Sequence, residues 1–199
     1  MITSVNAKEL AERRRTVGRP MRDVEIRVLD DAGNERRRGD IGEIFVRGPG
    51  LYSGYHDDAE RTQKAQRGEW FSLGDVGRMD EDGYLYLVDR KQDTIISGGE
   101  NIYPNDIEEV LAACPGVKEV AVIGVPDPTW GELVTAVIVL TPGTQPAPEA
   151  LINACAAKLP AYMKPRKVVF AEELPRNPVG KILRRVLREP YWQLEEEKI

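Results

Sequence analysis

The sequence predicts an α+β protein whose β-rich first part is followed by a smaller part that mixes strands with helices. Three observations predict this division. Apolar and polar residues alternate at positions 24–28, as they do in half-buried strands. An Asp-Gly pair at 82–83 stands between runs of aromatic and aliphatic residues, which is typical of a β-hairpin. After residue 90, apolar residues at helical spacing, such as those at 107–111, alternate with further strands.

The first part begins with a short polar helix at 6–15, which Asn6 is placed to cap. This helix has little apolar surface, so packing alone should hold it loosely. The rest of the first part is mostly β-structure, interrupted by glycine-containing turns. The patterns predict a helix at 59–65 and strands at 24–28, 41–46 and 84–88.

The second part predicts a small antiparallel sheet flanked by helices. Pro104 marks a helix start, because the first turn of a helix does not need the N–H that proline lacks. The other patterns predict helices at 146–158 and 181–188 and strands at 94–97, 120–125, 134–140 and 167–170. We therefore divide the chain into an N-terminal segment without a recognised motif (1–16), a β-rich subdomain (17–90) and a C-terminal domain (91–199).

Composition argues against several classes of function. The 199 residues include 28 Lys plus Arg and 33 Asp plus Glu, and the net charge of −5 disfavours a nucleic-acid partner. Cys114, Cys155 and the single histidine, His56, lack the spacing of metal ligands, so no metal site is expected. The same scarcity disfavours a Cys-His or Ser-His catalytic pair.

The chain carries no sign of membrane insertion or export. No apolar stretch approaches the roughly 18 residues of a membrane span, and the first residues lack the pattern of a signal peptide. We expect a cytoplasmic protein with reduced cysteines, or one that lies peripherally at a membrane.

A first candidate site is Gly74-Asp75, at the end of a predicted strand. A carboxylate beside a glycine can accept hydrogen bonds from the two vicinal hydroxyls of a ribose. The alternative is a turn aspartate that satisfies its own backbone.

The charged run DRKQD at 89–93 suits a solvated connector, and a connector between rotating domains would need the same polarity.

A second candidate site is formed by Gly98, Gly99 and Lys181. The two glycines permit positive φ and close approach of the backbone to a ligand, although such a pair alone is usually a turn. Lys181 follows a glycine at a predicted helix start, where its charge is electrostatically unfavourable, which favours a functional role. An ammonium beside a reacting phosphate and carboxylate stabilises the charge of the transition state. The alternative is a surface lysine in the basic run 181–188.

A third candidate site combines exposed rings with cations. A cationic side chain can bind a phosphate and an aromatic side chain can stack on a base. Such residues together favour the binding of a 3′-phosphorylated adenine nucleotide. A solvated basic loop is the alternative. The residues concerned are Trp130, Tyr162, Lys164 and Arg166.

Several of these segments resemble the AMP-forming acyl-CoA synthetases of the adenylate-forming superfamily. The likeness covers about residues 16–190, nearly the whole chain. Leu73 departs from the usual threonine, and Gln92 stands where the family's hinge has Asp or Lys. The segments that carry the resemblance are TVGRP at 16–20, WFSLGD at 70–75, IISGGENIYP at 95–104 and LPRNPVGK at 174–181.

The resemblance implies a role for each candidate residue. It implies that Asp75 and Arg90 bind the ATP or AMP ribose and that Gln92 acts as a hinge. It implies that Gly98 and Gly99 line the pantetheine tunnel and that Lys181 catalyses adenylation. The residues that it implies contact the CoA nucleotide are Trp130, Tyr162, Lys164 and Arg166.

The resemblance further implies an ATP-dependent ligase that converts a carboxylic acid, here a long- or medium-chain fatty acid, to acyl-AMP and then to acyl-CoA. Residues 17–90 would complete the barrel of the large domain, and residues 91–199 would form the mobile lid. The family's phosphate loop, acyl pocket and Mg²⁺ ligands are expected in an N-terminal large domain that this sequence lacks, so the chain alone is expected to be inactive. Two alternatives stay open: a free-standing CoA- or protein-binding module without catalysis, and an adenylating enzyme with a non-CoA acceptor.

Overall fold

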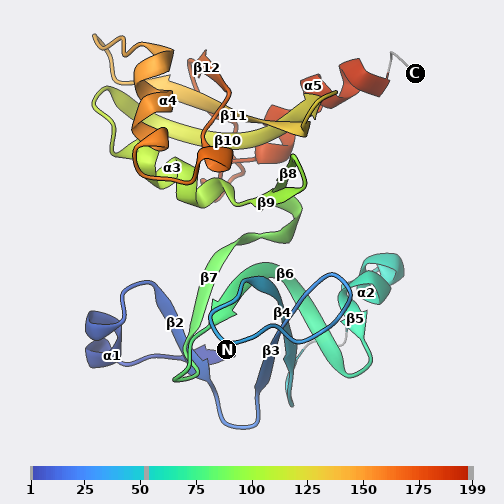
Figure 1. The fold of residues 1–199 in the computed structure, drawn as a ribbon. Coiled ribbons are helices and arrows are strands. Elements are labelled where there is room, and N and C mark those ends of the chain that lie inside the picture. Colours follow the sequence, from blue (N-terminus) through green and yellow to red (C-terminus); the bar gives the residue numbers. More distant parts are fainter. Residues whose placement is uncertain (1, 52–53, 197–199) are drawn as a thin grey trace. The chain divides into compact units, whose positions relative to one another are not determined.

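The computed structural model describes residues 2–51 and 54–196. By its internal contacts the chain forms two compact units, Met1–Gln92 and Asp93–Ile199, and each is described by itself. Their elements are labelled in Figure 1. The mixed α+β class predicted from the sequence is confirmed.

The first unit is built on one seven-stranded sheet in the order β1-β2-β7-β6-β4-β3, with β5 paired to β6. Every pairing is antiparallel. Ile44, Val46 and Leu85 form the centre of its core. The strands are β1 (Thr3–Ser4), β2 (Thr16–Pro20), β3 (Glu25–Leu29), β4 (Gly42–Arg47), β5 (Gln66–Arg67), β6 (Trp70–Met79) and β7 (Leu85–Arg90), and the helices are α1 (Ala7–Glu12) and α2 (Ala59–Ala65).

The N-terminal helix α1 begins at a capping box. The Asn6 side chain accepts a hydrogen bond from the Glu9 N–H at 2.9 Å, and the Glu9 carboxylate accepts one from the Asn6 N–H at 2.9 Å. This reciprocal pair satisfies two backbone donors that the first turn leaves open. No residue of α1 is buried, so apolar packing contributes little to holding it, as expected.

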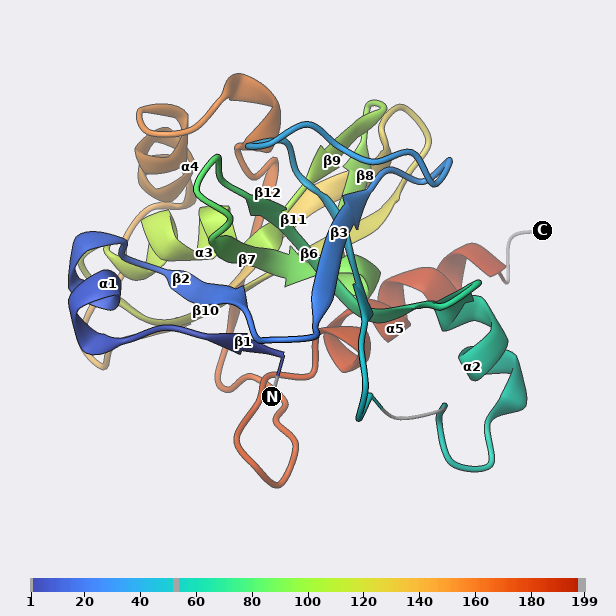
Figure 2. The ribbon, with the colours of Figure 1, turned by 90° about the horizontal axis from the view of Figure 1, so that it is seen from below.

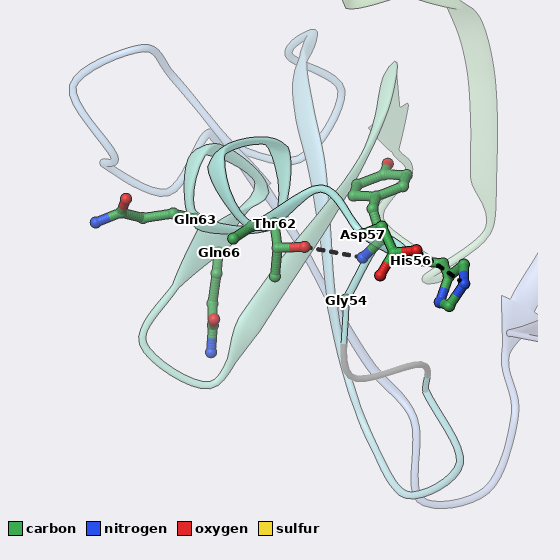
Figure 3. Close-up of a pocket in the computed structure, with 8 residues that line it drawn as sticks. Gly54, His56, Asp57, Thr62, Gln63 and Gln66 are labelled. Carbon is green, nitrogen blue, oxygen red and sulfur yellow. Dashed lines mark hydrogen bonds and ion pairs between the residues drawn. The ribbon is translucent and has the colours of Figure 1, made fainter.

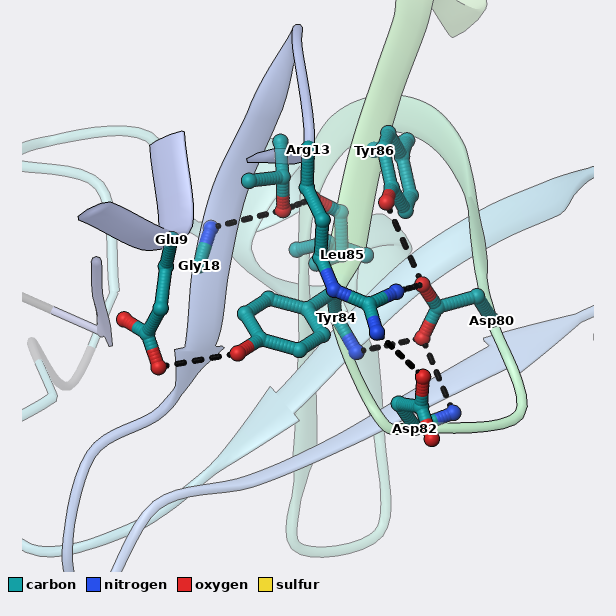
Figure 4. Close-up of polar contacts among 9 residues, drawn as sticks. Glu9, Arg13, Gly18, Asp80, Asp82, Tyr84, Leu85 and Tyr86 are labelled. Carbon is teal, nitrogen blue, oxygen red and sulfur yellow. Dashed lines mark hydrogen bonds and ion pairs between the residues drawn. The ribbon is translucent and has the colours of Figure 1, made fainter. Parts of the chain in front are cut away.

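Polar contacts hold α1 instead, and they reach the hairpin between β6 and β7 (Figure 4). Arg13 pairs with Asp80 at 2.9 Å and also with Asp82. The Tyr84 hydroxyl donates to Glu9 at 2.8 Å, and the Arg13 guanidinium lies 4.4 Å from the centre of the Tyr84 ring. The first residues are thereby tied to the same sheet that carries the candidate ribose site.

The second unit is built on a five-stranded sheet in the order β10-β11-β8-β9, with β12 paired to β11. The pairings are antiparallel except that β12 runs parallel to β11. The elements are η1 (Lys91–Asp93, across the boundary), β8 (Ile95–Ser97), β9 (Glu100–Ile102), α3 (Pro104–Ala112), β10 (Val117–Asp127), β11 (Gly131–Leu140), α4 (Pro148–Ala156), η2 (Ala161–Met163), β12 (Lys167–Ala171) and α5 (Arg184–Glu196).

Helices cover both faces of this sheet. On one face, Ile107 of α3 and Leu151 of α4 pack with Val122 of β10. On the other, Leu187 of α5 packs against a cluster that includes Ile123. Successive residues of a strand point to opposite faces, so a strand covered on both sides is almost continuously apolar, as β10 is. Figures 1 and 2 both show α3 and α4 beside each other and α5 apart from them.

Two local features bear on the sequence predictions. Cys155 is buried in the core and Cys114 partly buried against it, and both are free thiols. Burial raises the pKa of the Cys155 thiol to about 11, which suits an unreactive core residue. The predicted helix at 181–188 is wrong at its start: α5 begins at Arg184, and Lys181 lies in the preceding turn.

Candidate functional site

The predicted ribose-binding pair is brought together by the β6–β7 register. Asp75 of β6 lies directly opposite Arg90 of β7. The Arg90 Nε lies 3.0 Å from an Asp75 carboxylate oxygen, and the Asp75 side chain is 21% exposed. A carboxylate oriented by a guanidinium at the surface of a sheet still has lone pairs with which to accept hydroxyl donors.

The backbone around this pair is fixed by short-range contacts. Gly74 has a φ of +73°, which explains the glycine before Asp75. The buried Ser72 hydroxyl accepts a hydrogen bond from the Gly74 N–H at 3.0 Å and donates to the Glu43 carboxylate. The carbonyl oxygen of Leu73, the residue that departs from the family pattern, accepts a hydrogen bond from Arg90 at 3.3 Å, and its side chain packs against the core cluster of the first unit.

Next to Arg90, the connector is partly held by ion pairs. The Lys91 ammonium lies 2.6 Å from Glu43 and 3.0 Å from Asp31. Burial alone would lower the pKa of Lys91, but these two carboxylates outweigh it and raise the pKa. Gln92, the predicted hinge residue, follows inside the single turn η1, and the division between the two compact units falls directly after it.

Gly98 and Gly99 form the turn of the hairpin between β8 and β9. Ser97 pairs with Glu100 across the turn, and the two glycines have φ values of +60° and +84°. Two successive positive φ angles are what a tight two-residue hairpin requires. The Gly98 N–H donates to the Trp130 carbonyl at 2.8 Å, so this turn is docked on the β10–β11 turn.

Trp130 lies at the centre of the third predicted site. Its ring is 37% exposed, and the Arg166 guanidinium carbon lies 3.8 Å from the ring centre. A Cβ added at Gly98 would come within 3.0 Å of the same ring. Tyr162, in η2, is 46% exposed, and Lys164 follows that turn. The structure therefore brings Gly98, Trp130 and Arg166 together, with Tyr162 and Lys164 nearby in sequence.

Lys181 is exposed and lies at the end of a tight turn that follows β12 and precedes α5. The Asn177 side chain accepts a hydrogen bond from the Lys181 N–H at 2.8 Å, and the Asn177 N–H donates to the Lys181 carbonyl at 2.9 Å. Gly180, with a φ of +84°, closes the turn. Lys181 therefore does not have the unfavourable position at a helix N-terminus that the sequence predicted, because two residues separate it from Arg184, the first residue of α5.

Comparison with known proteins identifies the family of the chain. The family model described as "AMP-binding enzyme" matches residues 1–56, and the model described as "AMP-binding enzyme C-terminal domain" matches residues 106–181. The two matches lie in the two compact units. The chain belongs to the AMP-binding enzyme family of adenylate-forming ligases.

Curated relatives share much of the sequence with this AMP-binding family member. The long-chain-fatty-acid–CoA ligase FadD13 of Mycobacterium tuberculosis is 44% identical over 88% of the chain and 35% of its own length. The fatty acid–[acyl-carrier-protein] ligase ScoC of Streptomyces coeruleorubidus is 40% identical over 92% of the chain and 35% of its own length. The chain thus spans about a third of the length of the relatives it matches.

A solved structure gives the same picture of the fold. The o-succinylbenzoate CoA synthetase MenE of Bacillus subtilis, in complex with its acyl-adenylate intermediate, superposes with a TM-score of 0.86 and 34% identity. The superposition covers 94% of this chain and 38% of that protein.

Sequence reasoning missed two largely buried charged side chains of this AMP-binding family member. Arg184, treated as part of a basic surface, is only 13% exposed and has four oxygen acceptors on three residues. Glu132, next to the Trp130 turn, has one oxygen without a hydrogen-bond partner among the described residues. The i, i+4 spacing of Arg184 and Arg188 on the face of α5 that carries Leu187 was the available signal.

Glu132 is held beneath the Gly98 hairpin. It accepts a hydrogen bond from the Ile96 N–H, and Arg188 lies 3.7 Å away. Burial raises the pKa of Glu132, and the Arg188 charge and the Ile96 hydrogen bond only partly offset this. Its free oxygen lies over Gly124, where any side chain would clash.

A surface hollow of about 530 Å³ lies apart from all predicted site residues (Figure 3). The His56 and Asp57 side chains that border it are 97% and 88% exposed. We assign this open hollow no ligand. Its lining residues are Gly54, Tyr55, His56, Asp57, Ala59, Thr62, Gln63 and Gln66.

Between residues 2 and 196, with 52–53 aside, no cluster of three or more His, Cys, Asp or Glu side chains could hold a metal ion. In the same part of the chain, no helix is both long enough and apolar enough to cross a membrane.

Proposed function

We propose that this chain forms the C-terminal part of an ATP-dependent acyl-CoA ligase, which converts a fatty acid to acyl-AMP and then to acyl-CoA. The observation that carries the proposal is the match of both units to adenylate-forming enzymes, together with an exposed lysine on the turn at 177–181. A carboxylate-guanidinium pair suited to a ribose adds support from the first unit.

In the first half-reaction, a carboxylate oxygen of the acid attacks the α-phosphorus of ATP, and the bond to pyrophosphate breaks. Asp75, oriented by Arg90, accepts hydrogen bonds from the ribose hydroxyls and so fixes the nucleotide. The Lys181 ammonium lies beside the α-phosphate and the attacking carboxylate, where it stabilises the charge that builds in the transition state.

In the second half-reaction, the CoA sulfur attacks the acyl carbon and AMP leaves. The hairpin turn at Gly98 and Gly99 lets the pantetheine arm approach the backbone closely, because neither residue has a side chain. Trp130 and Arg166, together with Tyr162 and Lys164, contact the adenine nucleotide of CoA. The unit Asp93–Ile199 acts as a lid that turns about Gln92 to present Lys181 in one step and the glycine hairpin in the other.

Mg²⁺ would neutralise charge on the ATP phosphates in such a reaction. The residues described here do not supply a ligand set for it, since they contain no cluster of metal ligands. We place its ligands, the phosphate loop and the acyl pocket in a further domain, and we derive no step through the metal. We propose a cytoplasmic location for the ligase, as its reduced cysteines suggest.

A second acceptor is supported by the comparisons. The relative ScoC is described as a ligase of a fatty acid to acyl-carrier protein. A carrier protein presents the same phosphopantetheine thiol as CoA but no adenine nucleotide. The two acceptors are distinguished by the need for Trp130 and Arg166, which only the nucleotide of CoA would contact.

The test uses a chimera in which this chain replaces the matching segment of M. tuberculosis FadD13. The chimera should release pyrophosphate when given a fatty acid and ATP, and should form acyl-CoA when CoA is added. The chain alone should release none above background and should still bind CoA in a calorimetric titration. Pyrophosphate release by the chain alone would overturn its dependence on a further domain, and an inactive, folded chimera would overturn the ligase assignment.

A further inference from the structure

Arg184 is a largely buried cation whose hydrogen bonds reach two other parts of the second unit, the segment at Asp93 and helix α3. Its Nη1 lies 3.0 Å from Asp93, its Nε and Nη2 lie 3.1 and 2.7 Å from the two oxygens of Glu108, and its Nη2 lies 3.2 Å from the Asn105 side-chain oxygen. The side chains of Arg184, Asp93 and Glu108 are 13%, 12% and 17% exposed. Ion pairs this poorly solvated are weakly screened.

The partners of Arg184 occupy key positions along the chain. Asp93 is the first residue of the second unit, directly after the proposed hinge residue Gln92. Asn105 and Glu108 belong to the first turns of α3, which follows the glycine hairpin. Glu108 in turn accepts a hydrogen bond from the Val122 N–H at 2.7 Å, which anchors this helix to the edge strand β10.

Arg184 itself follows Lys181 by three residues and begins α5. The Leu183 N–H between them donates to the Pro175 carbonyl at 2.8 Å, and Arg176 donates to the Gly180 carbonyl at 2.6 Å. These contacts make the Lys181 turn compact within itself. The Arg184 side chain joins this segment directly to the start of the unit at Asp93, while Ile182 packs against the core cluster that includes Ile123.

We propose that Arg184 is a positioning residue that couples the Lys181 turn to the boundary at Asp93, so that rotation about Gln92 carries Lys181 as part of one rigid body. The proposal rests on the ligase function proposed above. The planar fork of a guanidinium can serve several acceptors at once, whereas a lysine ammonium cannot match this geometry. Arg184→Lys therefore keeps the charge but loosens the coupling.

The two half-reactions depend on this coupling differently. Lys181 acts in the first and reaches the boundary through Arg184. The glycine hairpin acts in the second and is held independently, by the Gly98 N–H bond to Trp130 and the pairing of Ser97 with Gly131. A residue that served only to keep the unit folded would affect both half-reactions by the same factor.

The experiment measures both half-reactions in the FadD13 chimera, the first by pyrophosphate release and the second by acyl-CoA formation from supplied acyl-AMP. Arg184→Lys should slow the first about tenfold to a hundredfold, as expected for a misplaced catalytic group, and change the second less than about threefold. Asp93→Asn, at the other end of the link, should reproduce this pattern, and Arg185→Lys, at an exposed neighbour, should change neither. Equal losses in both half-reactions, or no loss in either, would overturn the proposal.

A second measurement does not depend on activity. Hydrogen exchange of this chain should show the amides of residues 181–183 exchanging about tenfold faster in Arg184→Lys than in Arg185→Lys, because local opening becomes easier. Unchanged exchange overturns the coupling. If the unsubstituted chimera lacks the first half-reaction while the exchange result holds, the proposed ligase function fails and the coupling stands.

Discussion

The Arg166 guanidinium lies over the Trp130 ring, 3.8 Å from its centre, at the turn onto which the Gly98 hairpin docks. The ring attracts the cation and keeps its charge beside the turn. The same cation occupies a ring face on which an adenine would stack. We infer that Arg166 swings toward the CoA phosphates when the base takes its place.

Trp130→Ala should weaken the binding of CoA to this chain. Loss of the ring removes both the stacking surface for adenine and the support for Arg166, which is expected to cost about 1–2 kcal/mol, or roughly five- to thirtyfold in Kd. Isothermal titration calorimetry measures this directly.

Arg166→Gln should weaken CoA binding as well and should reduce its dependence on salt, whereas the exposed Arg185→Gln removes equal charge and should do neither. Unchanged CoA affinity in both Trp130→Ala and Arg166→Gln would point instead to a carrier-protein acceptor.

Asp75→Asn should raise the KM for ATP in the FadD13 chimera. Hydrogen bonds to an ionised group contribute about 1.5–3 kcal/mol each, so the loss is expected to exceed roughly tenfold. The sharper measurement compares ATP with 2′-deoxy-ATP. The unsubstituted chimera should prefer ATP, Asp75→Asn should lose most of that preference, and the exposed Glu81→Gln should keep it. A preference that survives in Asp75→Asn means that another group contacts the 2′-hydroxyl.

Lys181→Ala should slow pyrophosphate release by the chimera about 10²–10³-fold, as the loss of one transition-state donor does elsewhere. Formation of acyl-CoA from supplied acyl-AMP should change far less, because that step does not involve the α-phosphate of ATP. Lys118→Ala, which removes an exposed lysine from β10, is the matched control. A similar loss in both half-reactions would show that Lys181 acts outside adenylation.

Local sequence signals were enough to place some elements accurately. The Asp-Gly pair at 82–83 lies in the turn between β6 and β7, and α2 has the predicted bounds. Pro104 is the first residue of α3, as predicted from its missing N–H. In each case the deciding interaction lies within a few residues of the signal, so a short window of sequence contains the information.

The features that were missed depend on contacts between distant parts of the chain. Arg184 begins α5 and binds Glu108, which lies 76 residues earlier, so local spacing could indicate its face of the helix but not its partner. Likewise, Arg13 reaches Asp80, 67 residues later, and this attachment of α1 could not be predicted from its polar sequence. The resemblance to family motifs predicted which residues form the site. The charged side chains that contact the segments around those residues could be identified only from the three-dimensional fold.

Asp80 should stabilise the first unit in a pH-dependent way. Burial alone would raise the pKa of Asp80, but hydrogen bonds from the Tyr84 N–H and the Tyr86 hydroxyl, with the Arg13 charge, bring it below the ordinary value of 3.8. A lowered pKa means that stability is present above about 3.8 and is lost as pH falls through the folded value.

Asp80→Ala should therefore lower the free energy of unfolding at pH 7 by roughly 1–3 kcal/mol, since donors lose a charged acceptor. Urea denaturation between pH 7 and pH 2.5 should show the deficit shrinking toward the acid end. The exposed Glu81→Ala should have little effect at either pH. A deficit that stays constant with pH would mean that Asp80 acts through packing and not through its charge.

Glu132 gives the opposite dependence, because its pKa is raised by burial above the ordinary value of 4.5. The folded chain then binds the proton more tightly than the unfolded chain, so unfolding releases a proton and stability falls as pH rises from about 4.5 through the folded value. Glu132→Gln does not titrate and keeps an oxygen for the Ile96 N–H. Its free energy of unfolding, relative to the unsubstituted chain, should rise between pH 4.5 and pH 8 in urea denaturation. Other titrating groups cancel in this difference, and the exposed Glu172→Gln is the control. A relative stability that falls over the same range would show that the Arg188 ion pair outweighs the burial of the carboxylate.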